Sequence, residues 1–89
     1  MRTGQSRRRD VNEKAIVDAL REIGITVRRN SGEGVPDLLC WSRGVCLAIE
    51  VKTPHGSLTK AQQALYAEAP FPVVTTPAEA LALFGVVQS

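Results

Sequence analysis

The alternation of apolar and polar residues is clearest between residues 34 and 53. Two runs rich in apolar and β-branched residues flank Ser42-Arg43-Gly44. Strands of this length joined by a short glycine-containing turn are typical of a β-hairpin. If Arg43 and Gly44 form a two-residue turn, Ser42 lies opposite Val45, and every earlier residue has a defined partner. This register predicts which side chains of the hairpin meet.

The residues before the hairpin predict a basic arm and one helix. Residues 1–9 are polar and basic without apolar periodicity, so we expect a flexible N-terminal arm and a single domain over residues 10–89. Apolar residues recur at steps of three and four over residues 11–23. This spacing predicts an amphipathic helix that ends at Gly24.

The residues after the hairpin predict two helices and one more strand. One helix begins at Ser57 or Thr59 and is followed by a strand at residues 71–75. The sequence Thr76-Pro77-Ala78-Glu79 combines an N-cap residue, a proline at the first helical position and a glutamate at the third. With a short strand at residues 25–29, the order is helix, three strands, helix, strand, helix, which predicts an α/β chain.

Three charged residues interrupt the apolar runs of the hairpin. In the register above, Asp37 lies directly opposite Glu50, and Lys52 shares the face of Glu50 because side chains alternate along a strand. Like charges that face each other destabilise a sheet. A divalent cation held by both carboxylates would remove this repulsion. The alternative is that Glu50 and Lys52 are alternate charges on the solvent face of an edge strand.

These residues follow one another as in a known nuclease motif. Pro36-Asp37 followed by Glu50-Val51-Lys52 resembles the PD-(D/E)xK nuclease superfamily. Within that superfamily, the chain resembles the VRR-NUC domain family over roughly positions 13 to 83, through three blocks in order: Gly34-Val35-Pro36-Asp37-Leu38-Leu39, Ile49-Glu50-Val51-Lys52-Thr53 and Gly56-Ser57-Leu58-Thr59-Lys60-Ala61-Gln62. The resemblance implies a restriction-endonuclease-like αβββαβ core, with a four-stranded mixed sheet flanked by helices, and a C-terminal helix.

The resemblance also implies the metal-dependent hydrolysis of DNA phosphodiester bonds. The catalytic residues would be Asp37, Glu50, Lys52 and Gln62. The two carboxylates and the backbone carbonyl of Val51 would bind Mg²⁺ or Mn²⁺, which prefer hard oxygen ligands. Lys52 would either position or deprotonate the attacking water, or stay protonated and stabilise the transition state, and the sequence leaves both roles open.

Two further polar residues have both a structural and a functional interpretation. Asp10 and Glu13 are spaced as in a capping box, whereas related nucleases often carry a metal-binding glutamate on the first helix. Thr59 and Gln62 are spaced in the same way, whereas the family places this glutamine beside the active site. Both interpretations stay open for Glu13 and for Gln62.

Composition and charge restrict the class of protein. The chain has 89 residues, 44% hydrophobic and 22% charged, which is ordinary for one small globular domain. No apolar run reaches the ~18 residues of a membrane span, no signal peptide is evident, and Cys40 and Cys46 point to opposite faces of the hairpin. We therefore expect no membrane association, no disulfide and a cytoplasmic location.

The net charge of +2 is small, but the arginines are unevenly distributed. The candidate DNA contacts are Arg7, Arg8, Arg9, Arg28 and Arg29. The alternative for the first three is a solvated tail.

We expect an endonuclease that recognises DNA structure, such as a flap, a branch or a Holliday junction formed during repair. A chain this small has no room for a separate base-reading domain, which disfavours a restriction-type enzyme. A homodimer would present two sites to two strands. The aromatic candidates for its interface are Trp41, Tyr66, Phe71 and Phe84. The alternative function is a non-catalytic nucleic-acid-binding or assembly module on a nuclease fold.

Overall fold

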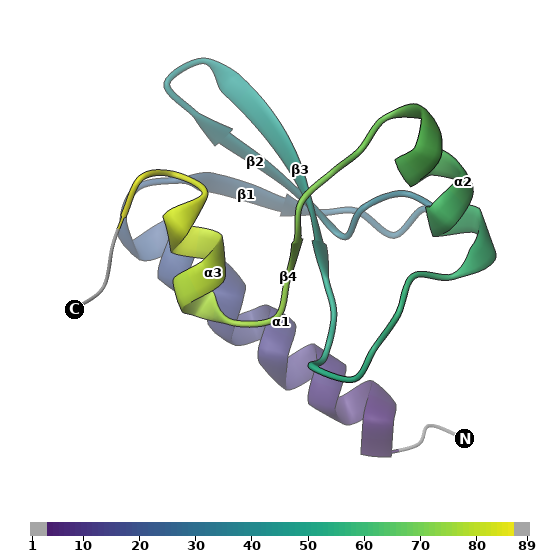
Figure 1. Cartoon of the computed structure of the whole chain (residues 1–89). Helices are drawn as coiled ribbons and strands as arrows, with labels where there is room; N and C mark the ends of the chain where they lie inside the picture. The colour runs from purple at the N-terminus through teal and green to yellow at the C-terminus, as the bar shows by residue number, and fades with distance from the viewer. Residues whose placement is uncertain (1–3, 87–89) are drawn as a thin grey trace.

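The computed structural model describes the backbone of residues 4–86 and the side chains of residues 11–86. Its elements are α1 (Gly4–Glu22), β1 (Thr26–Arg29), β2 (Leu38–Ser42), β3 (Val45–Val51), α2 (Lys60–Glu68), β4 (Val73–Val74) and α3 (Pro77–Ala82). Figure 1 shows α1 and α3 together on one side of the sheet, with α2 apart from both. The predicted element order is confirmed.

The sheet is mixed, as the resemblance implied. Its four strands lie in the order β1-β2-β3-β4. The first three strands form an antiparallel meander, whereas β4 pairs with β3 in parallel. A parallel pair needs a long crossover, and α2 lies within the crossover from β3 to β4.

The hairpin has the predicted register. Ser42 pairs with Val45, and the pairing continues without a bulge to Leu38 and Ile49. The turn residues Arg43 and Gly44 have φ values of 52° and 79°. Two consecutive positive φ values define a type I′ turn, whose twist matches that of the flanking strands. The turn and the alternating pattern therefore set the same register.

One face of the sheet and two helices form the hydrophobic core. The buried side chains on α1 are Ile16, Val17 and Leu20, each with no exposed surface. They pack with inward-facing residues of the strands and with residues of α3. The buried residues of the strands and of α3 in this core are Val27, Leu38, Cys40, Ile49, Val51, Val74, Ala80 and Leu81. Each strand contributes alternate residues to this core, as the period of two requires.

The first helix begins earlier than predicted. α1 starts at Gly4, so part of the segment assigned to the arm is helical, and Asp10 lies inside the helix. The Asp10 capping box is therefore wrong. Arginine and glutamine favour helix and need no apolar partner to extend one that has already formed, so the start of the apolar pattern did not mark the start of the helix. Residues 1–3 and the side chains of residues 4–10 lie outside the described residues.

The predicted cap of the last helix is confirmed. The Thr76 hydroxyl accepts a hydrogen bond from the Glu79 N–H at 3.1 Å, so Thr76 caps α3. Cys40 is buried and Cys46 is exposed, and both thiols are free. Burial raises the pKa of the Cys40 thiol to about 11.

Within residues 4–86, no helix has the length and apolar character needed to cross a membrane.

Candidate active site

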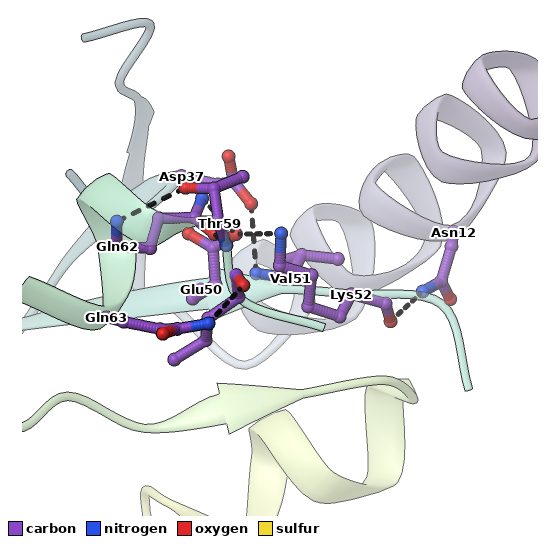
Figure 2. A network of polar contacts seen from close by, with 9 residues as sticks. Asn12, Asp37, Glu50, Val51, Lys52, Thr59, Gln62 and Gln63 are labelled. Atoms are coloured by element: carbon purple, nitrogen blue, oxygen red, sulfur yellow. Dashed lines mark hydrogen bonds and ion pairs between the residues drawn. The ribbon is translucent and has the colours of Figure 1, made fainter. Parts of the chain in front are cut away.

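Glu50 lies at the centre of a polar network near the end of β3. Its side chain has no exposed surface. Glu50 Oε2 accepts a hydrogen bond from Gln62 Nε2 at 3.0 Å and lies 3.3 Å from Lys52 Nζ (Figure 2). Glu50 Oε1 is also buried and has no hydrogen-bond partner among the described residues. A buried carboxylate oxygen without a partner is costly, so this atom marks a position suited to a ligand.

Asp37 reaches the same place from the residue before β2. Continuing the register of the hairpin pairs Asp37 with Glu50, as predicted. Its side chain is buried, and Asp37 Oδ2 accepts a hydrogen bond from the Val51 N–H at 3.0 Å. Its own carbonyl accepts a hydrogen bond from the Asn30 N–H at 2.7 Å. The backbone therefore holds the Asp37 side chain against β3.

The electrostatics of this pair favour a bound cation or proton. Burial raises the pKa of Glu50, and the negative charge of Asp37 raises it further. The hydrogen bond and positive charge of Lys52 act in the opposite direction without cancelling the shift. The repulsion inferred from the sequence is therefore present in the folded protein.

Gln62 caps α2 and also contacts Glu50. Its Oε1 accepts a hydrogen bond from the Thr59 N–H at 2.9 Å, and its own N–H donates to the Thr59 hydroxyl at 3.2 Å. These two bonds form the capping box of α2. Because Oε1 is used by the cap, the amide NH₂ group is directed at Glu50. Capping thus orients the glutamine toward the site.

Lys52 follows directly after β3, and its backbone is held from two sides. Its N–H donates to the Val74 carbonyl at 3.0 Å. Its carbonyl accepts from Asn12 Nδ2 at 3.2 Å (Figure 2). Its side chain is 14% exposed. The contribution of Asn12 was missed by sequence reasoning. The only sequence signal is its place next to Glu13 on the first helix.

Val51 lies between the two charged residues of β3. The N–H groups of Glu50 and Lys52 donate to carbonyls of residues 72 and 74. Because backbone groups alternate in direction along a strand, the amide and carbonyl of Val51 lie on the opposite edge of β3. The N–H on that edge meets Asp37. A metal-binding role for the Val51 carbonyl stays a prediction.

Glu13 is not brought to the carboxylate pair. Its Oε2 forms an ion pair with Arg29 Nε at 2.9 Å, on the face of the sheet that α1 covers. Within the described part of the chain, no three or more His, Cys, Asp or Glu side chains are grouped so that they could hold a metal ion. Arg28 is exposed and, as the neighbour of Arg29, lies on the other face of β1. The metal role of Glu13 and the DNA contacts of the arginines stay predictions.

A cleft of about 450 Å³ opens beside Asp37. Its walls are the loop at residues 30–35 and the start of α2, including Thr59 and Gln62. Gly34 has a φ of +77°, and a Cβ on this residue would lie 3.0 Å from the Ala61 Cβ. A glycine is therefore needed for the loop to approach α2 and form this cleft.

The carboxylate pair of Asp37 and Glu50 fits a divalent cation. The donors are carboxylate oxygens, which suit Mg²⁺ or Mn²⁺ rather than a metal that prefers sulfur or imidazole. Glu50 Oε1 lacks a described partner, and the second carboxylate raises the pKa of Glu50. A cation would satisfy the oxygen atom and remove the repulsion together.

Comparisons with known proteins agree with this fold. The family model of the VRR-NUC domain matches residues 4–69. A solved structure described as a VRR_NUC domain aligns with a TM-score of 0.71 and 25% identity, over 86% of this chain and 94% of that chain. A search of curated proteins found no significant match. Because the family match extends over most of the chain and the fold agrees, the protein belongs to the VRR-NUC domain family, a family of nuclease domains.

Proposed function

We propose that this protein is a Mg²⁺- or Mn²⁺-dependent endonuclease that hydrolyses DNA phosphodiester bonds. The observation that carries the proposal is the buried pair of Asp37 and Glu50, with one oxygen of Glu50 held by Lys52 and Gln62 and the other without a described partner. A module freed from catalysis has no physical reason to keep two repelling carboxylates in its interior.

Asp37, Glu50 and the Val51 carbonyl would hold the ion. When bound, the ion acidifies a water molecule and neutralises negative charge on the scissile phosphate. Gln62 acts as a positioning residue, because its amide holds Glu50 Oε2 while its oxygen is used by the cap of α2. The Val51 N–H holds Asp37 in the same way. The protein thus presents both carboxylates in fixed orientations.

Lys52 supplies positive charge at the site. Its ammonium group forms an ion pair with Glu50 at 3.3 Å, and the side chain as a whole is largely buried. We therefore assign it to stabilising the negative charge that develops on the phosphate, rather than to removing a proton from water. The Asn12 side chain supports this placement through the Lys52 carbonyl.

We further propose that the enzyme selects branched DNA, such as flaps or Holliday junctions, in DNA repair. The support is that the described residues form one small domain, and contacts to phosphates alone carry little information about base sequence. We place the protein in the reducing cytoplasm, because both cysteines are free and Cys46 is exposed.

The proposed activity predicts metal-dependent cutting with a preference for structure. Purified protein with Mg²⁺ or Mn²⁺ is expected to cut flapped and junction DNA faster than linear duplex of the same sequence, and EDTA is expected to stop the reaction. The measurement is gel analysis of end-labelled substrates. DNA binding without cutting of any substrate by either ion would instead support a non-catalytic nucleic-acid-binding module.

We also expect a homodimer, because a domain of this size has a small core and one site engages one strand. Phe71 is buried and Phe84 packs against the core, which leaves Trp41 and Tyr66 as exposed aromatic candidates. The edge strand β4 is another candidate contact, because Val73 is 41% exposed.

Light scattering at micromolar concentration is expected to give twice the monomer mass of 9.6 kDa. A Val73→Lys variant that is folded and monomeric would place the interface at β4. A mass near 9.6 kDa with and without branched DNA would contradict the dimer and favour nicking of one strand.

A further inference from the structure

The sheet has one face that the helices of the core do not cover. Residues paired across antiparallel strands point to the same face. One cross-strand row consists of Thr26, Trp41 and Cys46, the next of Arg28, Leu39 and Ala48, and the third brings Asp37 to Glu50. We call the first two rows the open face. Their alternating neighbours, such as Val27 and Cys40, are buried in the core on the other side.

The open face leads directly to the carboxylate pair. Trp41 lies on β2, four residues after Asp37 in the chain, which is about 14 Å at about 3.4 Å per residue. Arg28 lies in the row between them and is exposed. A DNA strand that follows β2 toward the cleft would therefore meet an aromatic ring, a positive charge and the two carboxylates, in that order. The distance is about four nucleotides of a stacked strand.

Trp41 is unusually accessible for its residue type. It is 38% exposed, and it is the only tryptophan of the chain. The smaller neighbours in its own row, Thr26 and Cys46, leave the indole as the largest surface there. Tryptophan more often buries most of its large surface, so an accessible one marks a contact surface.

We propose that Trp41 stacks on an unpaired base of the substrate a few nucleotides from the scissile phosphate. This proposal rests on the proposed nuclease function and names its substrate class, which is DNA with unpaired nucleotides next to the cleavage position. Bases inside a duplex are already stacked on both sides, so an indole ring can stack only on a base that is free. Arg28 contacts the adjacent phosphates. Contacts to phosphates fix the position of the strand but carry no information about its bases.

The single tryptophan makes binding directly measurable without catalysis. In EDTA, a short oligothymidylate is expected to quench the Trp41 emission, whereas a hairpin duplex is expected to leave it unchanged. By anisotropy of labelled DNA, Trp41→Ala is expected to weaken oligothymidylate binding about tenfold, and Trp41→Phe is expected to restore most of it. Val45→Ala is the matched control, because Val45 is 65% exposed on the opposite face of the hairpin.

Three outcomes would overturn the proposal. The first is that oligothymidylate binds to the protein but leaves the Trp41 emission unchanged. The second is equal weakening by Trp41→Ala and Val45→Ala. The third is that, without DNA, the Trp41 emission shifts as the protein concentration rises and the mass doubles. This result would place Trp41 in an interface between two copies of the chain. Thermal unfolding checks that each variant is folded.

A cleavage assay separates this proposal from the proposed function. With Mg²⁺, Trp41→Ala is expected to raise KM on flapped DNA while kcat stays near the wild-type value. If wild type cuts no DNA, the nuclease proposal fails, and the quenching in EDTA still decides the role of Trp41. If Trp41→Ala cuts flapped DNA with unchanged KM, the nuclease proposal stands and the stacking role is wrong.

Discussion

Replacing Lys52 with alanine is expected to reduce DNA cleavage by about 10²–10³-fold, the loss typical when one group that stabilises transition-state charge is removed. Lys52 Nζ lies 3.3 Å from Glu50 Oε2, so its positive charge sits at the carboxylate pair. The backbone of Lys52 is held by Val74 and Asn12, and truncation of the side chain leaves both bonds in place. The measurement is the single-turnover rate on flapped DNA at saturating Mg²⁺.

Two variants make this result specific. Asp37→Asn keeps an oxygen for the Val51 N–H but loses the negative charge, and it is also expected to lose cleavage. Lys14→Ala removes a lysine that is 71% exposed on α1 and pairs with Asp18, so the wild-type rate is expected. Circular dichroism checks the fold of each variant. A folded Lys52→Ala protein that cuts as fast as wild type would show that Lys52 has no catalytic role.

Glu50→Gln is expected to stabilise the metal-free protein at neutral pH. The pKa of Glu50 is raised above 4.5 in the folded protein, so the native state binds this proton more tightly than the unfolded chain does. Wild-type stability therefore falls as the pH rises from about 4.5 through the raised pKa, and the loss is complete above it. Glutamine is neutral throughout this range, and its carbonyl can still accept from Gln62.

The expected gain is a rise of several degrees in Tm, since about 1 kcal/mol corresponds to about 4–8 °C in a domain of this size. The lost ion pair with Lys52 offsets part of the gain. Thermal unfolding of wild type and Glu50→Gln in EDTA, between pH 4 and pH 8, tests the sign. Wild type is expected to lose stability relative to the variant as the pH rises.

Added Mg²⁺ is expected to make wild type more stable than Glu50→Gln. Binding to the native state stabilises wild type by about 2.7 kcal/mol at a hundredfold excess over Kd, and much less in Glu50→Gln. Glu68→Gln is the control, because Glu68 is exposed at the end of α2 and should leave the Mg²⁺ response unchanged. Equal Mg²⁺-induced shifts in wild type and Glu50→Gln would show that Glu50 does not bind the ion.

The local pattern of residues was enough to predict the hairpin and the pair within it. Side chains alternate with a period of two, and Arg43-Gly44 forms a turn that permits one register, so Asp37 and Glu50 are placed opposite each other by short-range geometry. The caps at Thr59 and Thr76 were also predictable, because each bond spans three residues. These features depend on contacts between near neighbours in the chain or across one turn.

The remaining features depend on how distant segments pack. The bond from Asn12 to Lys52 joins residues 40 positions apart, and the ion pair of Glu13 with Arg29 requires α1 to lie on one particular face of the sheet. That placement also leaves Trp41 exposed on the open face, and the local sequence pattern does not predict this exposure. Such contacts arise when α1 and α3 bury their apolar side chains on the sheet. The hydrophobic effect that drives this burial is non-directional and depends on the apolar area of the whole core. Only the tertiary structure could therefore decide them.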